Sequence, residues 1–279
     1  MQATGSRKAT GGTRASVALA RPGLGRTLAL NAIGLGVLWF IYSAVRTVTA
    51  DSFSVARENA DRLIEFQNAI GLPSEAVVQR FLLDYEWLVR SANVYYFAAH
   101  FPAMLAFLLW AMFAKREHMP RIRWALIGST TAGLVVHLAF PLAPPRMLRL
   151  SGFVDTASLF GPDPYALGIA KAANELAAMP SMHVGWALLI AMAVISVSSS
   201  RWRWAILAHP LITTAVVVVT ANHYWTDVIA GAALATLGWW ISGIRRPTPV
   251  LEADVVDDPE SFASIDLVED DLEDCPVIL

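Results

Sequence analysis

Long apolar runs dominate the chain and predict membrane-spanning helices. A transmembrane helix needs about 20 mostly apolar residues, and five or six windows of the sequence meet that requirement. The six windows are 28–48, 92–114, 122–143, 182–199, 203–221 and 224–243. We therefore expect an all-α, polytopic membrane protein built around a bundle of six transmembrane helices.

The segment 51–90 mixes charged and apolar residues at helical spacing, in ENADRLIEFQNAIGLP and then SEAVVQRFLLDYEWL. Helices with this pattern lie on a membrane surface. We expect an interfacial helical segment here, which either covers the bundle or acts as a lid that helps to select a lipid. A second connection, 144–180, is long and rich in proline. Long loops on a rigid scaffold frequently carry function.

Composition agrees with membrane residence, because 56% of the residues are hydrophobic and only 16% are charged. Residues 247–279 hold eleven acidic side chains and no Lys or Arg, which leaves the remainder at +9 (21 basic minus 12 acidic). We predict a disordered basic arm at 1–26, a membrane domain at 27–246 and a disordered acidic tail at 247–279. The single cysteine, Cys275, lies in that tail, so no disulfide forms within the chain.

Basic residues predict the orientation, because short cytoplasmic loops carry the excess of Lys and Arg. The arm has five of them, the 115–123 loop four, the 200–204 loop two and the 245–246 end two. With six spans, all four segments fall on one side. We therefore expect a multi-pass protein of the plasma (inner) membrane, with both termini in the cytoplasm.

Two ionisable residues, His223 and Asp227, begin the last apolar window in the run ANHYWTDVIAG. Ionisable groups inside a span are costly and need a reason. A spacing of four places both on one helix face, so Asp227 can orient the imidazole and leave the other ring nitrogen free as a nucleophile. The alternative is a polar pair that only stabilises the helix.

Further candidate residues lie at the same predicted face of the membrane. Pro180 and Ser181 begin the span that carries His183, and the amides of a helix's first turn can bind an anion. His183 could then protonate a leaving oxygen as a general acid. In FPLAPPRMLR, Arg146 is the first choice and Arg149 the second for binding phosphate oxygens; either could instead contact lipid phosphates.

The motifs PSMH and HYWTDVIAG resemble the second and third motifs of the type 2 phosphatidic acid phosphatase superfamily, and APPR matches the first motif loosely. The combination of APPR, MPSMHVGW and NHYWTD resembles the branch that contains inositol phosphorylceramide synthases. The similarity spans roughly 85–245. NVYYFAAH, which carries Tyr96 and His100, also resembles that branch, and these two residues could contact a head group or only anchor the helix.

This resemblance implies a six-helix bundle, a phosphohistidine intermediate on His223, orientation by Asp227 and proton donation by His183. It implies no metal and no other cofactor, and none of the six histidines has zinc-site spacing. Phosphatase members usually carry an Arg six residues before the nucleophile, where this chain has Val217. The synthase-like branch tends to lack that Arg as well, which favours transfer over hydrolysis.

We therefore expect a lipid phosphotransferase that acts on a phospholipid or other lipid phosphate at the extracytoplasmic face. A lipid phosphate phosphatase is the alternative enzyme. A lipid-binding or transport protein without activity is the alternative of another class. Nucleic acid is not an expected partner. His209 lies near the 200–204 loop, so we expect it away from the outward-facing site.

Overall fold

The computed structural model describes residues 22–49, 51–148, 152–162 and 174–244. The expected acidic tail, most of the expected basic arm and Arg149 lie outside the described residues. Helix α1 already begins at Leu24, within the last residues of that arm.

Regular structure in the described part of the chain is helical, apart from one isolated bridge between Leu142 and Ala177. The all-α expectation is therefore confirmed for these residues. The longer helices are α1(Leu24–Thr49), α2(Phe53–Ala69), α3(Glu75–Leu83), α4(Glu86–Val94), α5(His100–Ala114), α6(Met119–Ala139), α8(Met182–Val197), α9(Ala208–Val219) and α10(Trp225–Ile244). The short ones are the π-helical turn η1(Tyr95–Ala99), the 3-10 turns η2(Arg116–His118), η3(Pro145–Met147) and η5(Arg201–Leu207), and α7(Thr156–Phe160).

The expected count of six membrane spans is not confirmed. Among the described residues, three helical stretches are long and apolar enough to cross a membrane: Leu24–Thr49, Arg116–Ala139 and Arg201–Val219. The pair Glu86–Ala99 and Pro102–Ala114, bent by 41°, makes a fourth if it is one span. Helix α8 has 16 residues, so at 1.5 Å per residue it is about 24 Å long, short for a hydrocarbon core of about 30 Å. A window of apolar residues can be longer than the helix that forms within it, because hydropathy does not show where the helix ends.

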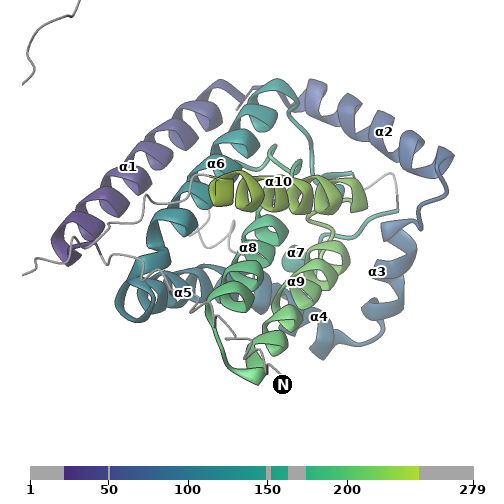
Figure 1. Cartoon of the computed structure of the whole chain (residues 1–279). Coiled ribbons are helices and arrows are strands. Elements are labelled where there is room, and N and C mark those ends of the chain that lie inside the picture. Colours follow the sequence, from purple (N-terminus) through teal and green to yellow (C-terminus); the bar gives the residue numbers. More distant parts are fainter. Residues whose placement is uncertain (1–21, 50, 149–151, 163–173, 245–279) are drawn as a thin grey trace, which may run out of the picture. The chain divides into compact units, whose positions relative to one another are not determined.

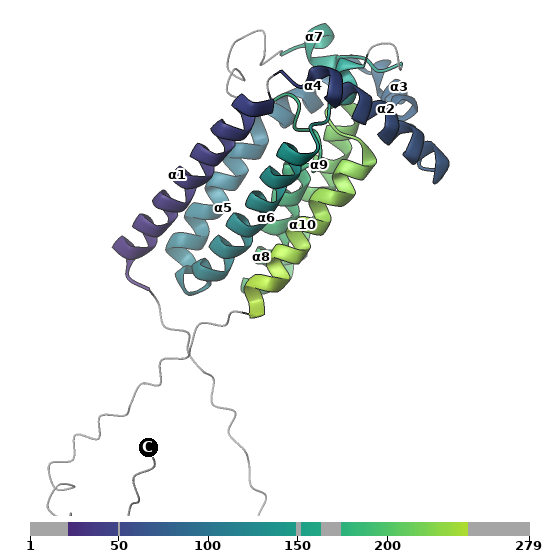
Figure 2. The same ribbon diagram turned by 90° about the horizontal axis from the view of Figure 1, so that it is seen from above.

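The apolar helices of the unit formed by residues 19–247 run side by side (Figure 2). Helix α10 packs against α6 and α8, and α1 packs against α6 (Figure 1). The amphipathic helices α2 and α3 gather with α7 beyond one end of these helices. The start of α1 and the end of α10 lie at the opposite end. Placement of α2 and α3 at a membrane surface stays a prediction.

The packed core lies between α5, α6, α8 and α10. These helices are apolar around most of their circumference, which is typical of helices that are buried or face lipid. The core is formed by Ala111, Ile122, Ala125, Leu189, Ile190, Ala235 and their neighbours. By contrast, α1 exposes large apolar side chains such as Phe40, which is 75% exposed. A surface of this kind suits contact with lipid.

Two glycines allow α8 and α10 to approach each other closely. A Cβ atom on Gly231 of α10 would overlap the carbonyl oxygen of Ser181 and lie 2.9 Å from its carbonyl carbon. A Cβ atom on Gly185 of α8 would lie 3.0 Å from the carbonyl oxygen of Gly231. The start of α8 therefore rests directly on the backbone of α10, and a side chain at Gly231 would separate them.

We predict that Gly231→Ala lowers the free energy of unfolding by about 1–3 kcal/mol, because the added methyl group forces α8 and α10 apart. Gly128→Ala in α6 is the matched control, since a Cβ there meets nothing within 4 Å. Thermal unfolding of the detergent-purified proteins measures both. Equal melting temperatures for the two variants would contradict the close approach.

Candidate active site

The candidate nucleophile His223 lies in a tight turn between α9 and α10. Helix α9 ends at Val219, and the backbone N–H groups of Asn222 and His223 both donate to the Val217 carbonyl, at 3.0 and 3.1 Å. Ala221 has a φ of 53°, a left-handed conformation that non-glycine residues rarely adopt. The backbone N–H of Arg146 donates to its carbonyl at 2.8 Å. The hydrogen bond from Arg146 therefore helps to hold the turn in this strained conformation.

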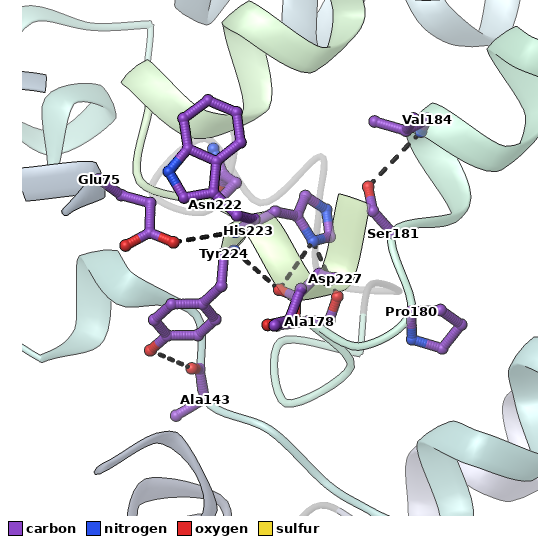
Figure 3. A network of polar contacts seen from close by, with 12 residues as sticks. Glu75, Ala143, Ala178, Pro180, Ser181, Val184, Asn222, His223, Tyr224 and Asp227 are labelled. Carbon is purple, nitrogen blue, oxygen red and sulfur yellow. Dashed lines mark hydrogen bonds and ion pairs between the residues drawn. The ribbon is translucent and has the colours of Figure 1, made fainter. Parts of the chain in front are cut away.

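The imidazole of His223 is buried and oriented by a backbone carbonyl. Its Nδ1 lies 2.8 Å from the Ala178 carbonyl oxygen and 3.5 Å from Oδ2 of Asp227 (Figure 3). A carbonyl oxygen can only accept, so Nδ1 carries the proton and donates it to Ala178. In the neutral ring the lone pair is then on Nε2. Ala178 is thus the closer partner of the ring, and Asp227 is the more distant one.

Burial keeps His223 neutral at ordinary pH. Loss of hydration disfavours the imidazolium and lowers the pKa of His223 to about 4, from an ordinary value near 6.5. The Ala178 hydrogen bond raises the pKa and the Arg146 guanidinium lowers it further, both by less than burial does. A neutral ring with a free lone pair is the form that a nucleophile requires.

Asp227 lies in the first turn of α10 and is fully buried. Its Oδ2 accepts the backbone N–H of Tyr224 at 2.9 Å, as an acidic residue does in a capping box. Its backbone carbonyl accepts the N–H of Ser181 at 2.9 Å. Asp227 therefore fixes the start of α10, places a carboxylate beside the His223 ring and joins α10 to the start of α8.

His183 is brought to the same place by α8. Ser181 caps this helix, and its buried hydroxyl oxygen accepts the N–H of Val184 at 3.5 Å. The ring centroids of His183 and His223 are 5.8 Å apart. The two histidines predicted from separate motifs are therefore neighbours. Figure 3 shows the hydrogen bond between this capping residue and Val184.

Tyr96 and His100, expected as possible head-group contacts, both lie against the His183 ring. Tyr96 stacks on it with centroids 4.5 Å apart, and the His100 centroid lies at 4.7 Å. His100 also stacks on Trp186 at 5.7 Å and lies 6.4 Å from His209. His209, which we expected away from the site, is thus linked to it through His100. This contact could not be predicted from the sequence, because the rings belong to different helices.

Arg146 is buried next to the turn that carries His223. Its Nε donates to Oδ1 of Asn222 at 3.1 Å, and its Nη2 lies 3.5 Å from Oε2 of Glu175. The Glu175 side chain is 41% exposed, so the ion pair lies at the rim of the site. Arg149 lies outside the described residues, so Arg146 is the described candidate for the phosphate-binding cation.

Sequence reasoning missed three partners: Ala178, Asn222 and Glu175. Ala178 contributes a backbone carbonyl, for which no side-chain pattern exists. Asn222 immediately precedes His223, and an amide at that position could have been considered as a ligand of Arg146. Among the described residues, no group of three or more His, Cys, Asp or Glu is arranged to hold a metal ion.

Comparison with known proteins supports the motif assignment. Residues 61–241 match the family model of the PAP2 superfamily. The inositol phosphorylceramide synthase catalytic subunit aur1 of Schizosaccharomyces pombe is 25% identical over 150 residues, which are 49% of this chain and 35% of that protein. The match thus spans about a third of the length of this curated relative. No solved structure matches the chain. Because the family match covers well over half of the chain and includes the segments that carry Arg146, His183 and His223, the chain belongs to the PAP2 superfamily.

Proposed function

We propose that this chain is a metal-independent lipid phosphotransferase that works through a phosphohistidine on His223. The observation that carries the proposal is the state of the His223 ring. It is buried, its Nδ1–H donates to the Ala178 carbonyl, which leaves the lone pair on Nε2, and the ring centroid lies 5.8 Å from that of His183. Membership of the PAP2 superfamily supports a lipid phosphoester as the substrate.

In the first step, Nε2 of His223 attacks the phosphorus of the lipid phosphoester. The bond from phosphorus to the leaving oxygen breaks, and the N–P bond forms. The negative charge of the bound phosphoester favours the protonated form of His183. The leaving alkoxide takes this proton from His183 and departs as an alcohol. In the second step, an acceptor hydroxyl gives its proton to His183 and attacks phosphorus, which frees His223. Protons and charge balance over the cycle.

Arg146 and the first turn of α8 provide the charge that stabilises the phosphoryl oxygens in this proposal. A guanidinium matches two oxygens of a phosphate, and helix amides at an N-terminus favour anions. Glu175 pairs with Arg146 in the structure, so a bound phosphoryl group would compete with this carboxylate. The Glu175 side chain is partly exposed, which leaves it able to move aside.

Transfer is favoured over hydrolysis by two observations. Val217 occupies the position where phosphatase members usually carry an arginine, and Val217 is fully buried in the structure. The matched relative is named as an inositol phosphorylceramide synthase, so an inositol phospholipid is one donor to test. With water as the acceptor, the same steps give a lipid phosphate phosphatase.

The six-span topology belongs to this proposal as well. The site lies at the end of the apolar helices where α2, α3 and α7 gather. The start of α1 and the end of α10 lie at the opposite end of these helices (Figure 2). If α8 and α10 are counted as spans, the distribution of basic residues favours a site at the extracytoplasmic face of the plasma membrane.

We predict that His223→Gln lowers turnover by at least about 10³-fold, because the nucleophile is lost. His118→Gln, a histidine in η2 at the other end of the chain's apolar helices, is the matched control and keeps its activity. Phosphate release and head-group exchange are measured with detergent-purified protein on a panel of lipid phosphates, with and without chelator. Equal turnover in wild type and His223→Gln would contradict the proposal, and lipid binding without turnover in the wild type would favour a lipid-binding protein.

The low pKa of His223 predicts an unusual pH profile. As the pH falls through about 4, the ring becomes protonated and loses its lone pair. The logarithm of kcat/KM, which reports the free enzyme, should therefore stay level on the acidic side down to about pH 4 and decrease below it. An acidic limb centred near 6.5 would show instead that His223 is hydrated and ionises freely.

Orientation can be tested by cysteine labelling in a Cys275→Ser background. Leu159 in α7 is 68% exposed, and Leu159→Cys should react with a membrane-impermeant maleimide added to intact cells. Arg201→Cys, at the opposite end, should react only in inside-out vesicles. The reverse pattern would place the site in the cytoplasm.

A further inference from the structure

The first turn of α10 is capped by side chains from a distant part of the chain. Helix N-termini leave N–H groups without intrahelical partners. Here the N–H of Trp225 donates to Oε1 of Glu75 at 2.9 Å, and the N–H of Thr226 donates to Oε1 of Gln67 at 3.0 Å. The Thr226 hydroxyl also lies 3.1 Å from that oxygen. Gln67 and Glu75 belong to α2 and α3, about 150 residues earlier in the chain.

These two side chains form one buried unit. Nε2 of Gln67 donates to Oε1 of Glu75 at 2.9 Å, and each residue is only 3% exposed. Burying a carboxylate and an amide is unfavourable unless their polar atoms are bonded. The start of α10 supplies those bonds, and the carboxylate interacts favourably with the positive end of the helix dipole.

Helix α3 also holds the other end of the turn that carries His223. Nε2 of Gln79 donates to the Val219 carbonyl at 3.1 Å, where α9 ends. Glu75 and Gln79 are four residues apart, so they share one face of α3. This face therefore contacts the chain immediately before and immediately after residues 220–224, the turn that carries His223 (Figure 3 shows Glu75 beside it).

We infer that Glu75, supported by Gln67, is a positioning residue for His223. It acts through the start of α10, and it does not touch the reacting atoms. The inference rests on the proposed function and assigns a task to the segment 51–90 beyond covering the bundle. A shift of about 1 Å in a nucleophile can cost on the order of 10²-fold in rate. The hydrogen bonds that hold this turn in place should therefore affect turnover.

Two variants separate the hydrogen bonds from the charge. Glu75→Gln keeps an oxygen that can accept both the Trp225 N–H and the Gln67 amide, so kcat should stay within about fivefold of wild type. Glu75→Ala removes both bonds, so kcat should fall on the order of 10²-fold with little change in KM. Glu58→Ala and Glu86→Ala are matched controls on the same segment, because their carboxylates are exposed and pair only with Arg62 and Arg90 among the described residues.

A spectroscopic measurement tests the inference without any turnover. Nitrogen NMR of histidine-labelled protein in detergent reports the tautomer of His223, assigned by its loss in His223→Gln. Wild type, Glu75→Gln and both controls should show the proton on Nδ1. Glu75→Ala should show a mixture of tautomers, because a displaced turn weakens the bond to Ala178. Gln67→Leu serves as a second disruptive variant if Glu75→Ala does not fold, and the same mixture is expected in it.

An unchanged tautomer and unchanged kcat in folded Glu75→Ala or Gln67→Leu would overturn the inference, as would a loss of activity that only follows the folded fraction. A wild-type protein without turnover would defeat the proposed function alone. The tautomer measurement would still decide whether Glu75 positions His223.

Discussion

The hydrogen bond from Nδ1 of His223 to the Ala178 carbonyl decides which ring nitrogen can react. Ala178 is followed by Met179, Pro180, Ser181 and the start of α8, so the segment that orients the nucleophile also presents His183. The N–H of Ser181 donates in turn to the Asp227 carbonyl, which joins this segment to α10. The two histidines are therefore neighbours because one short segment is bonded to both the ring of His223 and the helix that follows it.

Packing keeps this segment in place. Glycine at positions 185 and 231 lets α8 rest on the backbone of α10, and the carboxylate of Asp227 bonds the N–H of Tyr224 at the start of that helix. From the other side, the N–H of Arg146 holds the strained Ala221, and the Tyr224 hydroxyl donates to the Ala143 carbonyl at 3.0 Å. The turn is thus fixed by bonds to backbone atoms on several sides, which suits a nucleophile whose direction of attack matters.

Much of the candidate site could be predicted from the sequence, because His223 and Asp227 are only four residues apart and PSMH is a contiguous motif. The helical character followed from the apolar runs. The roles of Ala178, Gln67 and Glu75 could not be predicted: the first acts through its carbonyl, and the others cap a helix about 150 residues away. Stacking of Tyr96 and His100 on His183 also depends on how helices pack. The six-span count is not confirmed, because hydropathy windows do not register where a helix ends, as α8 does at Val197.

In the proposed reaction, Nε2 of His223 carries the phosphoryl group between donor and acceptor. Trapping is the most direct test: the enzyme is mixed with a lipid phosphoester donor without acceptor, quenched in base and digested, and the peptide that contains His223 is analysed by mass spectrometry. We expect an acid-labile phosphoramidate adduct on His223 that disappears when acceptor is added. An adduct on another residue, or turnover with donor and acceptor reacting directly and no adduct at any time, would contradict it.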